Sequence, residues 1–249
     1  MAIIKLLMKS TKVLFIATSH DKMADTTEKT GVGLEELAAP YYIFKEAGAD
    51  LTLASPGGGR VPLDPKSQSI ILATSSTKRF LKDEEAMNFL YNAIPLEEVD
   101  DGDFDVIFLP GGYGLMWDLA DSKKVRQLLE AFHSKDKPIG ATSHGVACLL
   151  SLKNNKGEDL IKGKQLTGIS NSEENLSRSK DVTPFLLETE LLLIGALYSK
   201  GENYVSHVVE DGNIITGQNP ASSKGVAQKI VDLVKHNKFI DNLLQPVSN

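Results

Sequence analysis

Short apolar runs alternate with helical patterns along most of the chain, and this alternation most constrains the fold. Residues 12–18 (KVLFIAT) and 49–54 (ADLTLA) have the composition of buried strands. Between them, apolar residues that include Tyr41 and Phe44 recur at helical spacing, and Gly48 marks the helix end. A strand, a helix and a second strand at this spacing predict a βαβ unit, which implies parallel strands covered by helices on both faces.

The same alternation continues toward the end of the chain. Further strands are predicted at 104–109, 138–142, 165–169, 205–209 and 213–216, and further helices at 125–132, from about Gly145, at 184–196 and at 221–236. The pattern predicts a single α/β domain over residues 1–249: a flavodoxin-like three-layer sandwich with a mostly parallel central sheet and a nucleophile elbow. A chain of 249 residues is long enough to bury a large core within one such domain.

Two segments depart from this regular alternation. Residues 60–100 contain Pro62, Pro65, a stretch rich in serine and threonine, and one short amphipathic segment at 84–91. We predict that they form an insertion packed over one end of the sheet, above the site. Residues 238–249 are predicted to be a tail.

Charge and hydropathy exclude several classes of function. The net charge is −6 and no basic stripe is interleaved with aromatic residues, so no nucleic-acid partner is expected. No run of eighteen apolar residues occurs, so no membrane partner is expected. Lys5 and Lys9 interrupt the apolar N-terminus and no small-residue cleavage site follows, which argues against a signal peptide.

The cysteine and histidine residues indicate the cellular compartment and whether a metal site is expected. Cys148 is the single cysteine, so no internal disulfide can form, and a cytoplasmic location is predicted. Cys148 falls within an apolar helical pattern and is expected to be a small core residue. The histidines lack metal-ligand spacing, and we predict neither a metal nor a cofactor.

The strongest chemical signal is the segment Ala141-Thr142-Ser143-His144-Gly145, which lies between a predicted strand and a predicted helix. A nucleophile elbow requires small residues two before and two after the nucleophile, and Ala141 and Gly145 fill these places around Ser143. The helix N-terminus would also present N–H groups to an oxyanion. The alternative is an ordinary strand–helix turn with a solvent-facing serine.

Two other segments should converge on the same edge of the sheet, because each follows a strand. In 110–114 (PGGYG), the N–H of Gly112 or of its neighbour could stabilise an oxyanion, although a tight turn is an equal explanation. In 217–220 (GQNP), Asn219 and Pro220 are typical of a helix start.

Two glutamates and one histidine complete the candidate site. Glu35 and Glu36 cannot both face the same way on their helix, so we expect Glu36 to be buried within hydrogen-bond reach of Ser143 and Glu35 to be exposed. The alternative is a pair of solvated glutamates. His144 could be a base, but adjacent residues tend to point apart, so it need not contact the hydroxyl of Ser143.

The motifs LEELAAPY, ASPGGG, FLPGGYG, SHG, SNSEE and TGQNPASS occur in this order between about Lys12 and His236. In this combination the chain resembles the ThiJ/PfpI superfamily (class I glutamine amidotransferase-like), and in particular its branch of glutathione-independent glyoxalase III and heat-shock chaperone-like proteins. The resemblance covers nearly the whole chain.

The resemblance assigns a role to individual residues. It places Ser143 at the position of the nucleophilic cysteine, His144 next to it, and Glu36 as a proton carrier. Glu174 matches the acidic third member of the triad, with Glu173 as a rival by one position. The resemblance further implies an oxyanion or substrate-binding role for Gly112, Tyr113 and Asn219, with Tyr113 standing where many relatives have histidine.

The function implied by the resemblance is conversion of methylglyoxal to lactate, or hydrolysis of a related small carbonyl substrate, without a cofactor. Ser143 is expected to weaken this activity, because a hydroxyl is hardly ionised without a base, whereas a cysteine is partly thiolate. The alternatives are a non-catalytic stress-response chaperone or ligand-binding protein, and a serine introduced in place of a natural cysteine. Relatives are commonly dimers, and the apolar segment 184–196 leaves surface to cover, so a homodimer is expected.

Overall fold

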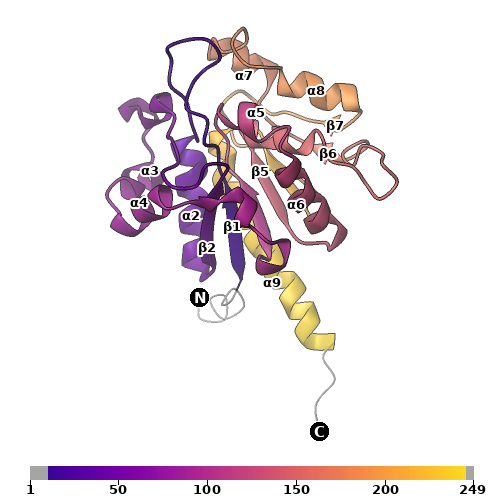
Figure 1. Cartoon of the computed structure of the whole chain (residues 1–249). Helices are drawn as coiled ribbons and strands as arrows, with labels where there is room; N and C mark the ends of the chain where they lie inside the picture. Colours follow the sequence, from indigo (N-terminus) through magenta and orange to yellow (C-terminus); the bar gives the residue numbers. More distant parts are fainter. Residues whose placement is uncertain (1–10, 245–249) are drawn as a thin grey trace.

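The computed structural model describes residues 11–244, with a seven-stranded sheet at its centre (Figure 1). The strand order is β3-β2-β1-β4-β5-β9-β8, and β8 alone pairs antiparallel within this sheet. The mostly parallel α/β fold predicted from the sequence is therefore confirmed. The strands are β1 (Lys12–Ile16), β2 (Asp50–Ser55), β3 (Ile94–Pro95), β4 (Val106–Leu109), β5 (Ile139–Thr142), β8 (Val208–Asp211) and β9 (Ile214–Gly217).

Helices cover both faces of the sheet because successive side chains of each buried strand point to opposite sides. Val13 and Phe15 pack with one set of helices, and Leu14 and Ile16 pack with the other. The first face carries α2 (Leu34–Ala47) and α9 (Ser223–Leu244). The second carries α6 (Lys123–Ser134) and the 3₁₀ helix η5 (Ser143–Leu149).

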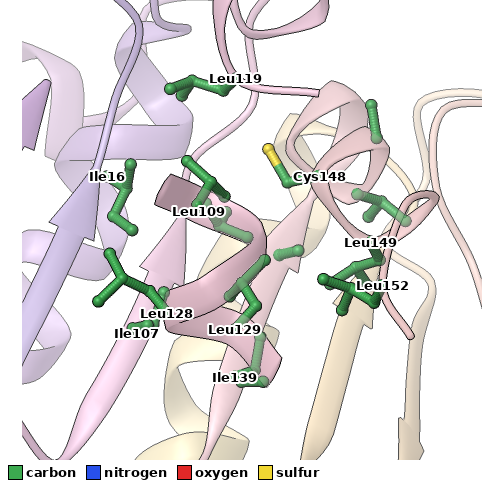
Figure 2. Packing of buried hydrophobic residues seen from close by; sticks show 14 of the residues in the cluster. Ile16, Ile107, Leu109, Leu119, Leu128, Leu129, Ile139, Cys148, Leu149 and Leu152 are labelled. Atoms are coloured by element: carbon green, nitrogen blue, oxygen red, sulfur yellow. The ribbon is translucent and has the colours of Figure 1, made fainter. Parts of the chain in front are cut away.

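The core of the second face consists of aliphatic side chains from strands and helices (Figure 2). Leu128 and Leu129 of α6 lie over Ile107 of β4 and Ile139 of β5 in this cluster. Cys148 is 1% exposed and lies in the same apolar cluster, as the sequence predicted for a small core residue. Burial raises the pKa of its thiol, with the charge of Asp118 adding to the effect, so Cys148 remains neutral.

Shorter elements surround this frame. The remaining helices are α3 (Ser75–Phe80), α4 (Glu84–Tyr91), α5 (Leu115–Asp118), α7 (Asn171–Leu176) and α8 (Leu187–Ile194). The other 3₁₀ turns are η1 (Pro65–Gln68), η2 (Ile70–Leu72), η3 (Leu96–Glu98), η4 (Asp101–Asp103) and η6 (Pro220–Ser222). Figure 1 draws α7 and α8 together, far from the N-terminal end of β1.

Several predicted elements differ from those observed. The predicted strand at 165–169 is reduced to β6 (Gln165–Leu166), which leaves the central sheet and pairs with β7 (Leu197–Tyr198). The insertion predicted at 60–100 includes β3, which pairs with β2 and forms the edge of the central sheet. Part of this segment therefore belongs to the frame of the fold.

The ends of the chain also differ from expectation. The helix predicted at 221–236 continues as α9 to Leu244, into the segment predicted to be a tail. Residues 1–10, for which no signal peptide was predicted, lie outside the described residues, as do 245–249. Between residues 11 and 244, no helix combines the length and apolar character needed to cross a membrane.

Candidate active site

The central feature of the site is a strained serine at the end of β5. Ser143 has a φ of 52°, in the left-handed region that non-glycine residues rarely adopt. Two residues later, a Cβ on Gly145 would lie 2.5 Å from the carbonyl oxygen of Leu109, so only glycine fits there. Ser143 is 2% exposed, so the reading as an ordinary turn with a solvent-facing serine is wrong. Strain of this kind is typical of a nucleophile elbow.

Ser143, His144 and Glu174 form a continuous hydrogen-bonded series. Oγ of Ser143 lies 3.2 Å from Nδ1 of His144, and Nε2 of His144 lies 2.7 Å from Oε1 of Glu174. The sequence left open whether His144 contacts Ser143, and the structure places the two side chains in contact. With the ring proton on Nε2, the lone pair of Nδ1 faces the hydroxyl, as a general base requires.

The charges of this series stabilise one another. Burial disfavours the imidazolium, but the charge and hydrogen bond of Glu174 outweigh it and raise the pKa of His144. Burial likewise opposes ionisation of Glu174, but His144 and neighbouring hydroxyls lower the pKa of this carboxyl. Glu174 therefore remains ionised and holds the imidazole in place.

Glu36 of α2 meets Ser143 at Gly111, which follows β4. A Cβ on Gly111 would lie 1.8 Å from Oε1 of Glu36 and 2.8 Å from Cβ of Ser143, so both side chains occupy the space that glycine leaves free. Glu36 is 4% exposed, as predicted, and within the described chain its Oε1 has no hydrogen-bond partner. Burial raises the pKa of Glu36 to about 7, although the charge of His144 and the hydroxyl of Ser143 act to lower it.

The prediction that Glu35 is exposed to solvent is wrong. It is half-buried and accepts a hydrogen bond of 2.5 Å from Oγ1 of Thr74, in the N-cap of α3. The two glutamates nevertheless differ in the expected direction, because Glu36 alone reaches Ser143.

Gly112 and Tyr113 form the wall of the site after β4. Gly112 has a φ of 121°, and a Cβ there would lie 2.3 Å from the carbonyl oxygen of Gly31, so close packing explains this glycine. The ring of Tyr113 lies over the ring of His144, with centroids 4.1 Å apart. Its hydroxyl is 3.3 Å from Oε2 of Glu174 and 2.6 Å from Oγ of Ser179.

Glu173 and Asn219 belong to a separate buried network. Glu173 accepts hydrogen bonds from Asn219 at 2.9 Å, Gln218 at 3.0 Å and the backbone of Tyr204 at 2.8 Å. Glu174, and not Glu173, therefore contacts His144. Nδ2 of Asn219 also donates to the carbonyl of Val205 at 2.8 Å, so its amide is engaged in structure and not aimed at Ser143. Its sequence-predicted place at a helix start is confirmed, because it caps η6.

Sequence reasoning missed Asp64 and Ser179. Asp64, before η1, is close enough for its charge to raise the pKa values of both Glu36 and His144. Ser179 donates to Glu174 at 2.6 Å. Asp64 lies in the segment 62–67 (PLDPKS), one of the motifs shared with the ThiJ/PfpI superfamily, but the motif was not linked to a role. Ser179 lies in no motif, so no signal in the sequence pointed to it. Among residues 11–244, no cluster of three or more histidine, cysteine, aspartate or glutamate side chains is arranged to hold a metal.

A strained serine between a parallel strand and a helix, backed by a histidine and a glutamate, defines an α/β protein with a nucleophile elbow. The chain belongs to the DJ-1/PfpI family, whose model matches residues 23–233.

Comparison with individual proteins places the chain near glyoxalases of this family. It is 26% identical to the glutathione-independent glyoxalase HSP31 of Saccharomyces cerevisiae, over 92% of this chain and 100% of that protein. The crystal structure of glyoxalase III from Candida albicans superposes with a TM-score of 0.81 at 27% identity, covering 89% and 96% of the two chains. Rapid Encystment Protein 24 kDa of Francisella tularensis gives a TM-score of 0.85 at 37% identity, covering 90% and 99%. The chain thus resembles the glyoxalase III branch, as its sequence motifs indicated.

Proposed function

We propose that the chain converts small 2-oxoaldehydes such as methylglyoxal to 2-hydroxy acids such as lactate, with Ser143 as the nucleophile. The observation that carries the proposal is the bonded series of Ser143, His144 and Glu174, which meets the buried carboxyl of Glu36 at Gly111. The reaction needs a nucleophile and a separate proton carrier, and these correspond to Ser143 and Glu36. Similarity to proteins named glutathione-independent glyoxalase supports the same reaction class.

In the first step, Oγ of Ser143 bonds to the aldehyde carbon while its proton passes to Nδ1 of His144. The aldehyde oxygen gains the electron pair of its double bond and then accepts the proton from His144, which gives a hemiacetal and leaves His144 neutral. We assign stabilisation of this oxygen to the backbone N–H of Gly112, the residue that follows Gly111, where Ser143 and Glu36 come together. Glu174 stabilises the imidazolium that forms during the transfer.

In the second step, Glu36 removes the hydrogen of the former aldehyde carbon as a proton, and its electron pair forms the double bond of an enediol. Glu36 then returns a proton to the neighbouring carbon. The ketone oxygen gains a proton and the hemiacetal hydroxyl loses one, with His144 as the carrier for both. A carboxyl with a pKa of about 7 suits this task, because at neutral pH it both accepts and donates protons readily.

The third step releases the product. The rearranged intermediate is an ester of Ser143, and a water molecule adds to its carbonyl while His144 accepts the proton of the water. His144 then returns the proton to Oγ of Ser143 as the C–O bond breaks. One water is consumed in total, and the enzyme regains its starting protonation.

The proposal predicts that the purified protein forms lactate from methylglyoxal and that Ser143→Ala and Glu36→Gln each abolish this activity. Ser143→Cys should raise the rate, because sulfur is the better nucleophile at neutral pH. The idea is wrong if Ser143→Ala retains lactate formation. A folded Ser143→Cys variant with no activity would refute the choice of substrate class.

A second candidate, a non-catalytic stress chaperone, is favoured by one observation. Ile70 and Ile71 of η2 are 90% and 94% exposed, which is unusual for large apolar side chains and typical of a surface that binds other proteins. Under this alternative, the protein suppresses aggregation of a heated client protein, and replacing both isoleucines with serine removes the effect. Equal suppression by both forms would exclude this surface.

We also propose a cytoplasmic homodimer. The cytoplasmic location is supported by a single cysteine, which leaves no internal disulfide for an oxidising compartment to form. The dimer is supported by α8, where Leu192 and Leu193 are 53% and 74% exposed. Covering these side chains with a second copy would remove apolar surface from water.

A further inference from the structure

The carboxyl of Glu174 has a different partner on each oxygen. Oε1 accepts from Nε2 of His144 at 2.7 Å, whereas Oε2 accepts from Oγ of Ser179 at 2.6 Å and lies 3.3 Å from the hydroxyl oxygen of Tyr113. Glu174 is 0% exposed and Ser179 is 2% exposed, so water does not compete for these bonds. The two hydroxyls come from separate parts of the chain, one after β4 and the other after α7.

We infer that Ser179 and Tyr113 are positioning residues, which fix the Glu174 carboxylate in the one orientation that supports His144. This inference rests on the proposed function for its catalytic consequence, although the positioning itself is a property of the resting protein. With these two residues, the hydrogen-bonded series runs through Tyr113, Ser179, Glu174, His144 and Ser143.

Counting hydrogens gives the series a direction. An ionised carboxylate only accepts, so the single hydrogen of the Ser179 hydroxyl points to Glu174. The oxygen of Ser179 then accepts from Tyr113 across 2.6 Å. Burial and the charge of Glu174 both raise the pKa of Tyr113, so its phenol stays protonated and remains a donor.

The fixed orientation matters because the last torsion of a glutamate side chain is otherwise broad. If Oε2 lost its donors, the carboxylate could turn toward other partners and weaken its bond to Nε2 of His144. The imidazole would then lose the group that keeps its proton on Nε2 and its lone pair toward Ser143. A buried oxygen left without donors also costs about 1–3 kcal/mol, which favours such a rearrangement.

The charge environment of His144 makes the effect measurable. The charged groups that face His144 are Glu174 of α7, Glu36 of α2 and Asp64 before η1, and all three raise its pKa. Glu174 in turn faces His144 and the hydroxyls, and its charge raises the pKa of the nearby Tyr204 phenol. The hydrogen bond from His144 to Glu174 stabilises the imidazolium, and a carboxylate that turns away from Nε2 no longer does so. Removal of the Ser179 or Tyr113 hydroxyl should therefore lower the pKa of His144.

The test uses Ser179→Ala and Tyr113→Phe, the second of which keeps the ring over His144. Ser134→Ala is the matched control, because the exposed Ser134 hydroxyl of α6 donates to the main-chain oxygen of Ala131 at 2.9 Å and not to Glu174. The readouts are the NMR titration of the His144 imidazole in the resting protein and the pH dependence of kcat/KM for lactate formation.

We expect both test variants to titrate His144 at lower pH than the wild type, with the acid limb of kcat/KM moved in the same direction. We expect kcat to fall by about tenfold or more in Ser179→Ala, with little change in KM. Ser134→Ala should leave the titration in place. An unmoved His144 titration in Ser179→Ala and Tyr113→Phe would overturn the inference, as would an equal shift in Ser134→Ala. If Ser179→Ala does not fold, Tyr113→Phe alone decides by the same criterion. If the wild type forms no lactate, the proposed function fails, and the NMR titration still decides the positioning role.

Discussion

Glu36 should cost the folded protein stability at neutral and alkaline pH, and Glu36→Gln should recover it. The pKa of this carboxyl rises from the ordinary value of 4.5 to about 7 on folding, because it is buried. A group with a raised folded pKa contributes its full stability below the unfolded pKa and loses it as the pH rises through the folded pKa. At about 1.4 kcal/mol for each pH unit, the shift corresponds to at most roughly 3.5 kcal/mol.

The measurement is the free energy of unfolding by urea at pH 5 and at pH 8, for the wild type and for Glu36→Gln. Glutamine resembles the protonated acid, so the variant should exceed the wild type by less than about 1 kcal/mol at pH 5 and by about 3 kcal/mol at pH 8. Glu210→Gln is a suitable control because this carboxylate is exposed and pairs only with Lys229 at the surface, so its effect should stay below about 1 kcal/mol. A variant whose advantage is the same at both pH values, or absent at pH 8, would refute the reasoning.

Three further predictions concern other parts of the molecule. Glu173→Gln should lower the free energy of unfolding by about 2–5 kcal/mol in urea titrations, because it leaves buried donors unpaired. Glu174→Gln should chiefly abolish lactate formation. The reverse pattern would exchange the roles of the two glutamates. Gly145→Ala should destabilise by roughly 1–3 kcal/mol because its Cβ meets backbone at 2.5 Å, while Gly201→Ala, whose nearest contact is 3.3 Å, should have little effect in the same assay. Light scattering should give a dimer mass that Leu193→Glu reduces to that of a monomer, and a monomeric wild type at micromolar concentration would end the dimer proposal.

The frame of the fold could be predicted from the sequence because its signals are local. Runs such as 104–109 and 138–142 are apolar and β-rich, and Gly48 ends α2 in the left-handed conformation that favours glycine. The edge strand β3 and the small sheet of β6 and β7 could not be predicted in this way. Each of these strands has two residues, and their pairing depends on contacts with distant segments.

The candidate site could likewise be predicted from the sequence only where its residues stand in local motifs. Ser143 and Glu36 stand in recognisable motifs, and the structure brings them together. The contact between Ser143 and His144 could not be predicted, because the elbow motif indicates a strained backbone at Ser143 but not where the ring of His144 lies. Asn219 has the same amide whether it faces a substrate or Glu173, and only the packing of α7 decides. Ser179 is one serine among several until the fold places it beside Glu174.

The central claim, that Ser143 is a nucleophile, is tested most directly by trapping its covalent intermediate. The protein would be mixed with methylglyoxal, quenched in acid during turnover, digested and mapped by mass spectrometry. The account predicts an added mass equal to one substrate molecule on the peptide with Ser143, released by hydroxylamine as an ester would be, and absent from Ser143→Ala. Lactate formation without any hydroxylamine-sensitive adduct on that peptide, or with one in Ser143→Ala, would contradict it.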